Sequence, residues 1–283
     1  MDYTYLVDEI FPAGEIHLIA GASGVGKSTW MMQFLDQWRE YKLIFGRKSH
    51  PLPYTWCSLD RSLKSMNKTF ERVGVLGVPN VDCRGIVELA KVIESGREVC
   101  PDAKVFFIES FGLLAPSGVR GDYGNVGLFL TRASRLCERE DITIFASVHL
   151  AKTKEGQGYT DPRQKVSGSV AWAAMTDTIV LIERSDPQKL TDNSRKVSVL
   201  PRNEAEMEYE YKLDNQGRFI LERDRPVEEI MNIVIEKMPK EFSFQDIVIA
   251  SFDAGVSLAS LKRWLTESGT VKRKAHGVYE RLV

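Results

Sequence analysis

Residues 21–28 read Gly-Ala-Ser-Gly-Val-Gly-Lys-Ser, which is a complete phosphate-binding loop. An apolar run at Ile16–Ala20 precedes the loop and an amphipathic stretch at Thr29–Trp38 follows it. Strand, glycine loop and helix therefore stand in the required order. Glycines let successive backbone N–H groups turn toward phosphate oxygens, and the N-terminus of the next helix adds partial positive charge. We expect the chain to bind a nucleoside triphosphate with Mg²⁺.

Two side chains of the loop carry specific chemistry. Lys27 can reach the β- and γ-phosphates, and the Ser28 hydroxyl can ligate Mg²⁺. The alternative, a glycine turn of no consequence, is disfavoured because eight positions and both flanks agree. The other residues expected to line the phosphates are Gly21, Ala22, Ser23, Gly24, Val25, Gly26 and Thr29.

Composition restricts the class of protein without naming a function. A chain of 283 residues has room for one α/β domain of about 200 residues and a smaller unit. The net charge of -1 gives no global basic field, so any contact with nucleic acid must be local. No membrane span or secretory leader is recognised, which predicts a cytoplasmic protein with no membrane partner. No disulfide or zinc framework is indicated by the spacing of Cys57, Cys83, Cys100 and Cys137.

Apolar β-rich runs alternate with helical patterns through the first 225 residues, which predicts an α/β fold with a mainly parallel sheet flanked by helices. An antiparallel edge follows, at Arg195–Leu200, Glu208–Leu213 and Phe219–Arg223. The parallel strands are expected at Ile16–Ala20, Tyr54–Leu59, Val105–Ile108, Thr143–Val148 and Thr178–Ile182. The helices are expected at Thr29–Tyr41, Leu63–Val73, Ile86–Ser95, Val126–Glu140 and Val170–Met175.

A second unit is expected after a hinge at Asp224-Arg225-Pro226, because proline ends one element and the pattern then changes. The expected domains are 1–224 and 225–283. Three helices followed by a hairpin predict a small winged helix-turn-helix domain. The helices are expected at Val227–Met238, Phe244–Phe252 and Ser257–Glu267, and the hairpin strands at Val271–Lys274 and Val278–Leu282.

Two expected strands end in carboxylates, Asp60 after Tyr54–Leu59 and Glu109 after Lys104–Ile108. Open α/β sheets bind ligands at the carboxyl ends of their strands, so both acids are site candidates. Glu109 could also be an ordinary strand-end carboxylate.

Taken in order, these motifs resemble the RecA-like ATPases of the RepA and DnaB type, the hexameric replicative helicases. The resemblance covers about residues 10–223. It also rests on Ile142–Lys152, similar to a motif with a polar γ-phosphate sensor, and on the Gly-Ser segment at Val166–Trp172. It implies a ring of copies of this chain, a hexamer, that hydrolyses ATP with Mg²⁺ and moves on single-stranded DNA.

The resemblance also implies roles for single residues. Glu109 corresponds to the Mg²⁺-facing acid and Asp60 to the general base that polarises the attacking water. In the family the first is usually aspartate and the second glutamate, so the lengths are exchanged here and which acid is the base stays open. His149 corresponds to the γ-phosphate sensor, although a strand-end histidine can simply be solvated or locally hydrogen-bonded.

Basic residues are the expected nucleic-acid and partner contacts. Lys152–Ser167 resembles a channel loop that grips single-stranded DNA, and Pro116–Asp122 is a second candidate for channel lining or subunit contact. Both can equally be solvated loops. Arg202 is the candidate that completes a neighbour's site, with Arg184 and Arg195 as rivals. A basic face for duplex DNA or a protein partner is expected from Lys262, Arg263, Lys272, Arg273, Lys274 and Arg281, with Trp264 in the core.

The sequence therefore predicts an ATP-dependent DNA motor, a ring-forming helicase of a plasmid, phage or mobile element. One alternative is a RecA-like ATPase that does not unwind DNA, such as a recombination mediator. Another is a DNA-binding regulator whose oligomeric state is set by ATP.

Overall fold

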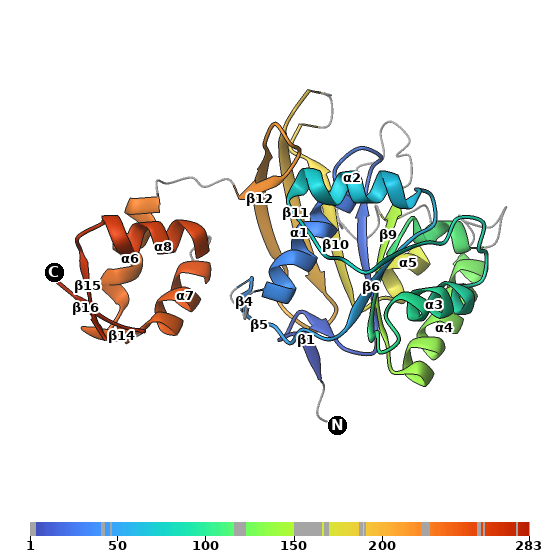
Figure 1. Ribbon diagram of the computed structural model, residues 1–283, viewed down its shortest axis with the longest axis horizontal. Coiled ribbons are helices and arrows are strands. Elements are labelled where there is room, and N and C mark those ends of the chain that lie inside the picture. Colours follow the sequence, from blue (N-terminus) through green and yellow to red (C-terminus); the bar gives the residue numbers. More distant parts are fainter. Residues whose placement is uncertain are drawn as a thin grey trace.

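The computed structural model describes residues 4–40, 43–45, 47–115, 123–149, 166, 170–186, 189, 191–221, 227–253, 256, 258–275 and 277–282. Its largest element is a nine-stranded sheet in the order β13-β12-β11-β10-β3-β9-β8-β6-β7 (Figure 1). The strands are β3 (Ile16–Gly21), β6 (Tyr54–Ser58), β7 (Asn80–Asp82), β8 (Val105–Glu109), β9 (Thr143–His149), β10 (Thr178–Arg184), β11 (Ser194–Pro201), β12 (Met207–Leu213) and β13 (Phe219–Leu221).

The strands from β10 to β7 along this order pair in parallel, whereas β10, β11, β12 and β13 pair antiparallel. The expected mainly parallel α/β sheet with an antiparallel edge is confirmed. Strand β7 was not expected, because three half-buried residues with polar ends carry too little apolar pattern. Two small two-stranded sheets accompany the main one, β1 (Tyr5–Val7) with β2 (Phe11–Pro12) and β4 (Leu43–Ile44) with β5 (Arg47–Lys48).

Helices cover both faces of the sheet. Helices α1 (Lys27–Glu40) and α2 (Leu63–Val73) supply side chains to one hydrophobic cluster. Helices α3 (Leu89–Val99), α4 (Tyr123–Glu140) and α5 (Val170–Ala174), with the short 3₁₀ helix η1 (Phe111–Leu114), border the other. The alternation within β8 shows the division, because Phe107 packs in the first cluster and Phe106 in the second.

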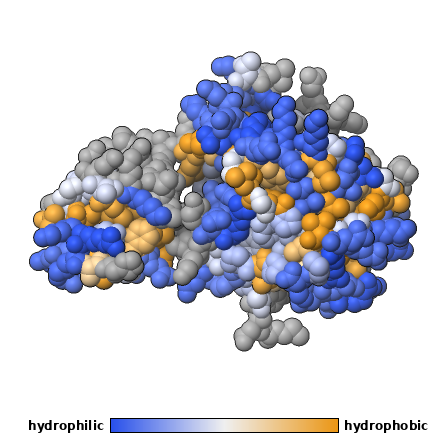
Figure 2. Space-filling view, in the orientation of Figure 1, coloured by the Kyte–Doolittle hydropathy of each residue, from blue (hydrophilic) through white to orange (hydrophobic). Residues whose placement is uncertain are grey.

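Stacked aromatic rings join the central strands on the α1 side. The ring of Phe107 lies 5.7 Å from that of Trp56 and 5.0 Å from that of Phe145, with interplanar angles of 8° and 9°. These three rings span β6, β8 and β9, so they fix the spacing of the strands whose ends carry the candidate acids and His149. In Figure 2 hydrophilic residues cover most of the coloured surface in this view, and hydrophobic residues show between them.

One helix has the expected boundaries, and two others begin at residues that differ from the expected ones. Helix α2 has the expected bounds, with the Ser62 side chain accepting from the Ser65 amide and Gly74 in the left-handed region at its end. Helix α3 begins three residues later than expected, after a turn with Gly85 at φ 84°. Helix α4 begins at Tyr123, earlier than expected. The expected hinge at Asp224–Pro226 lies outside the described residues.

The last part of the chain has its own core. It contains α6 (Val227–Lys237), β14 (Glu241–Ser243), α7 (Phe244–Asp253), α8 (Leu258–Glu267), β15 (Val271–Ala275) and β16 (Val278–Arg281). The order of the strands is β14-β16-β15, and β14 was not expected. Trp264 is 5% exposed and packs in this core, as predicted.

Two remaining expectations concern cysteines and membranes. All four cysteines are free, and Cys57, Cys83 and Cys137 are buried, in agreement with packed thiols. Among the helices of the described ranges, none is long and apolar enough to cross a lipid bilayer.

A buried histidine gives the core a predicted pH dependence. His17 is fully buried in β3, its Nε2 bonds the Pro12 carbonyl at 2.9 Å, and burial lowers its pKa from 6.5 to about 3. Unfolded chains bind a proton below pH 6.5 that the folded chain rejects, so this residue costs stability as pH falls from 6.5 toward 3. We expect wild type to lose about 1.4 kcal/mol per pH unit more than His17→Leu over that window. Urea unfolding at pH 7, 6 and 5 measures the difference, and parallel pH profiles would contradict the prediction.

Candidate nucleotide-binding site

The glycine loop has the conformation that its sequence predicts. Gly24 and Gly26 have φ values of 73° and 108°, a region that side chains disfavour. Gly21 tolerates no side chain, because a Cβ there would lie 2.7 Å from the Ile182 carbonyl oxygen. Helix α1 begins directly after the loop at Lys27. The N-terminus of α1 and the turned backbone therefore face the same anion position.

Lys27 lies folded over the loop. Its side chain is 8% exposed, and its Nζ donates to the carbonyls of Gly21 at 2.8 Å and Ala22 at 2.9 Å. It also lies 3.2 Å from Nδ1 of His149, the last residue of β9. Burial lowers the pKa of Lys27 to about 8, although Glu109 and Asp60 oppose that shift. Among the described residues, the hydrogen-bond partners of this ammonium are not carboxylates. The ammonium can therefore exchange them for hydrogen bonds to a phosphate.

The contact with Lys27 also defines the state of His149. A ring nitrogen that accepts from an ammonium is unprotonated, so the imidazole is neutral in this arrangement. Burial, followed by the charge of Lys27, lowers the pKa of His149. The predicted sensor is thus brought to the phosphate loop by the register of β3 and β9, which pairs Gly21 with His149.

The two candidate acids are held in different environments. Glu109 is 2% exposed, and Arg61 grips it with Nε to Oε2 at 3.1 Å and Nη2 to Oε1 at 2.5 Å. Asp60 is exposed and accepts from the Ser110 hydroxyl at 2.6 Å. Ser58 Oγ lies between the acids, 3.5 Å from Asp60 and 3.4 Å from Glu109. Asp60 is therefore the carboxylate of the pair that faces solvent without an arginine partner at hydrogen-bond distance.

Sequence reasoning missed Ser110 and Arg61. Ser110 is a non-glycine residue at φ 58° and ψ 37°, and its backbone N–H donates to Ser147 Oγ at 2.8 Å. Such a conformation costs energy and is retained where neighbouring contacts hold it, commonly at functional sites. The available signal was position, because Arg61 directly follows Asp60 and Ser110 directly follows Glu109. The direction in which a side chain points cannot be read from one sequence.

Arg195 corrects one expectation. It is 3% exposed, and its guanidinium donates to the carbonyl of Val25 at 3.0 Å and of Asp192 at 2.7 Å. It therefore supports the phosphate loop of its own chain and is not available to complete the site of a neighbouring copy. Phe219 supports the loop as well, because a Cβ on Gly26 would lie 2.8 Å from its ring. Arg184, which pairs with Arg195 in the sheet register, has contacts within the chain.

Arg202 lies at the opposite edge of the sheet from the loop. Strand β10 pairs Ile182 with Gly21 at one end and Thr178 with Pro201 at the other, and Arg202 follows Pro201. Its Nη2 donates to the carbonyls of Ala174 at 2.8 Å and Thr176 at 3.1 Å, and its side chain is 46% exposed. The fold therefore does not bring Arg202 to the site of its own chain.

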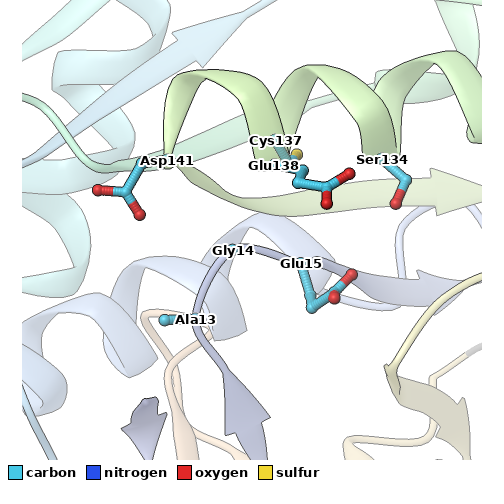
Figure 3. A pocket seen from close by; sticks show the side chains of 7 residues that line it. All are labelled: Ala13, Gly14, Glu15, Ser134, Cys137, Glu138 and Asp141. Carbon is cyan, nitrogen blue, oxygen red and sulfur yellow. The ribbon is translucent and has the colours of Figure 1, made fainter. Parts of the chain in front are cut away.

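A cavity at the same far edge contains none of the predicted site residues. Its volume is about 380 Å³. Figure 3 shows the carboxylates of Glu15, directly before β3, and of Glu138, on α4, at this cavity. Burial, then Asp177, raises the pKa of Glu15 to about 7. The lining residues are Ala13, Gly14, Glu15, Ser134, Cys137, Glu138 and Asp141.

Magnesium would depend on the nucleotide here. Within the described residues no cluster of three histidine, cysteine or carboxylate side chains could hold a metal alone. Mg²⁺ is commonly bound by one or two protein ligands together with phosphate oxygens, so the residues fit that mode. Ser28 would ligate it, and Glu109 would face it through water, since Oε1 of Glu109 has a second lone pair beyond its bond to Arg61 Nη2.

The predicted loops fall largely outside the described residues. This holds for Pro116–Asp122 and for Lys152–Ser167, of which only Val166 is described, as a buried residue.

The low pKa of Lys27 predicts pH-dependent nucleotide affinity. Phosphate binding requires the ammonium, so affinity should fall about tenfold per pH unit above pH 8 and be flat from 7 to 7.5. Calorimetric titration with ADP from pH 7 to 9.5 measures it. Lys27→Arg is the matched control, because its guanidinium stays protonated and its profile should be flat. Equal slopes for both proteins would contradict the assignment.

Comparisons with known proteins agree with this geometry. A KaiC-like protein from the hyperthermophilic archaeon Pyrococcus horikoshii OT3 has a similar structure, with a TM-score of 0.53 and 16% identity. The match covers 77% of this chain and 94% of that one. A search of curated proteins finds no match. Residues 3–155, more than half of the chain, match the AAA domain family AAA_25. The chain therefore belongs to the AAA domain family and has a RecA-like P-loop ATPase fold.

Proposed function

We propose that the protein is an ATP-dependent DNA motor, a ring-forming replicative helicase of the RepA and DnaB type. The contact between Lys27 Nζ and His149 Nδ1 at 3.2 Å carries this proposal. Lys27 must turn to the phosphates when ATP binds, so its bond to His149 must change. His149 lies three residues before the basic segment Lys152–Ser167, which the proposal assigns to single-stranded DNA. Nucleotide state and DNA grip are thereby linked through one hydrogen bond.

The environments of the acids support Asp60 as the general base. An exposed carboxylate oriented by the hydroxyl of Ser110 can accept a proton from the attacking water. Glu109, neutralised by Arg61, suits a role beside the metal. Mg²⁺, when bound, would neutralise charge that develops on the phosphate oxygens.

The position of Arg202 supports assembly into a ring. Its guanidinium is at the end of the strands opposite to its own phosphate loop, so any nucleotide site that it completes belongs to another copy. An arginine supplied in trans is a large contribution to phosphoryl transfer in other ATPases. We assign Arg202 this role, in a homo-oligomer that the family resemblance makes a hexamer.

For the C-terminal part we propose a winged helix-turn-helix domain, with domains at 1–224 and 225–283. The order of α6, β14, α7, α8, β15 and β16 supports it. Its expected basic face is smaller than the sequence suggests. Arg281 donates to the carbonyls of Ile235 and Glu236 at the end of α6, and Lys274 pairs with Glu241. Lys262 and Lys272 are exposed and are the residues we assign to duplex DNA or a protein partner.

A DNA-binding regulator controlled by ATP is the second candidate. The ion pair of Glu109 with Arg61 favours it, because a neutralised acid suits tight binding with slow turnover. This candidate predicts little response of hydrolysis to DNA.

Steady-state hydrolysis with and without single-stranded DNA separates the two. We expect stimulation of about tenfold in wild type, abolished in Lys27→Ala, which removes the ammonium that holds the phosphates. His149→Ala should lose a larger factor from the DNA-stimulated rate than from the unstimulated rate, since it interrupts the link to the basic segment. A low rate unchanged by DNA, despite ATP binding, would reject the motor.

Substitution of each acid tests the assignment of the base. Asp60→Asn should bind ATP normally and lose about 100-fold or more in turnover, because asparagine cannot accept the proton. Glu109→Gln should change the Mg²⁺ concentration that gives half-maximal rate. Equilibrium binding of ATP and a magnesium titration of the rate measure both effects. The roles would be reversed if only Glu109→Gln lost turnover at saturating Mg²⁺.

A further inference from the structure

Arg61 makes the most complete set of side-chain bonds at the site. Its guanidinium donates to both carboxylate oxygens of Glu109, at 3.1 and 2.5 Å. A third bond runs from Nη1 to Thr69 Oγ1 at 3.0 Å, on α2. Its own backbone N–H donates to Ser58 Oγ at 3.1 Å. Such a forked pair with extra anchors has a single orientation.

The partner of Arg61 is deeply buried, which makes the pair consequential. Glu109 is 2% exposed, whereas the Arg61 side chain is 25% exposed. A buried carboxylate without a cation is strongly disfavoured and takes the nearest available counter-charge. Removal of Arg61 would therefore leave Glu109 in need of another cation.

We expect Lys27 to become the counter-charge of Glu109 in that case. Strand β9 lies between β3, which leads into the phosphate loop and Lys27, and β8, which ends at Glu109, so the two charges stand at the same edge of the sheet. The charges of Glu109 and Asp60 both favour the protonated form of Lys27 and raise its pKa against the effect of burial. The present partners of Lys27 are two carbonyls and His149. In a low-dielectric site the attraction between an unpaired Glu109 and Lys27 would be large and would compete with phosphate for the ammonium.

We propose that Arg61 is a positioning residue that neutralises Glu109 and thereby keeps Lys27 available to the nucleotide's phosphates. Arg61 itself touches no phosphate in this arrangement. The proposal rests on the proposed nucleotide binding of the chain and adds a residue that the motif does not contain. It explains why an arginine directly follows the strand-end acid Asp60, turned toward β8.

Binding of ADP, which is not hydrolysed further here, tests the proposal by calorimetry in Mg²⁺ and again in EDTA. Arg61→Gln should weaken binding about tenfold or more in EDTA, because Lys27 is drawn to Glu109. In EDTA, where Glu109 has no Mg²⁺ to face, the double variant Arg61→Gln with Glu109→Gln should regain most of the affinity that Arg61→Gln loses, since no charge then competes for Lys27. Arg61→Lys, which keeps the charge, should also stay close to wild type.

Arg84→Gln is the matched control. It breaks another forked arginine pair, in which the exposed Arg84 donates to the half-buried Asp82 at the end of β7, at 2.7 to 3.0 Å. We expect no change in its ADP affinity. Thermal unfolding of each variant confirms that binding is measured on folded protein, and Arg61→Lys covers the case in which Arg61→Gln does not fold.

The outcomes separate this inference from the function on which it rests. Wild type that binds no ADP in either buffer would reject the proposed function. Wild type that binds, with Arg61→Gln equal to it, would overturn only the role of Arg61. Failure of the double variant to regain affinity, or an equal loss in Arg61→Lys, would also overturn that role.

Discussion

The parallel pairing of β3 between β9 and β10 is the constraint on which the site depends. Its register places Gly21 beside His149 on one side and Ile182 on the other. Parallel strands end at the same edge, so one register delivers the phosphate loop and the candidate sensor together. Aromatic packing beneath this edge, through Phe107 and Phe145, keeps the strands at a fixed spacing.

Charge at this edge is divided into separate pairs rather than pooled. Glu109 is neutralised by Arg61, while Asp60 is held by hydroxyl groups and Lys27 by carbonyls and His149. The division leaves one ammonium and one exposed carboxylate without an ionic partner at hydrogen-bond distance within this set. Those are the two charges that a phosphate and an attacking water require.

The antiparallel strands have a different task at each of their ends. Near the loop, Arg195 and Phe219 brace Val25 and Gly26 from the same chain. At the far end, β11 delivers Arg202 to an edge remote from its own loop. Strand β11 thus carries Arg195, which supports the phosphate loop, and leads to Arg202 at the opposite end. This arrangement is compatible with the proposed ring.

The sequence by itself determined the phosphate loop, the alternation of the strands and helices other than β7, and the elements of the C-terminal part other than β14. These follow from local signals, namely glycines at left-handed positions, apolar periodicity, and caps such as Ser62 and Gly74. Only the tertiary structure decided which charges meet. Arg195 and Arg281 looked like free cations but support a loop and cap a helix, while Arg61 proved to hold Glu109. Such pairings depend on strand register and rotamer across distant segments, which local sequence does not encode.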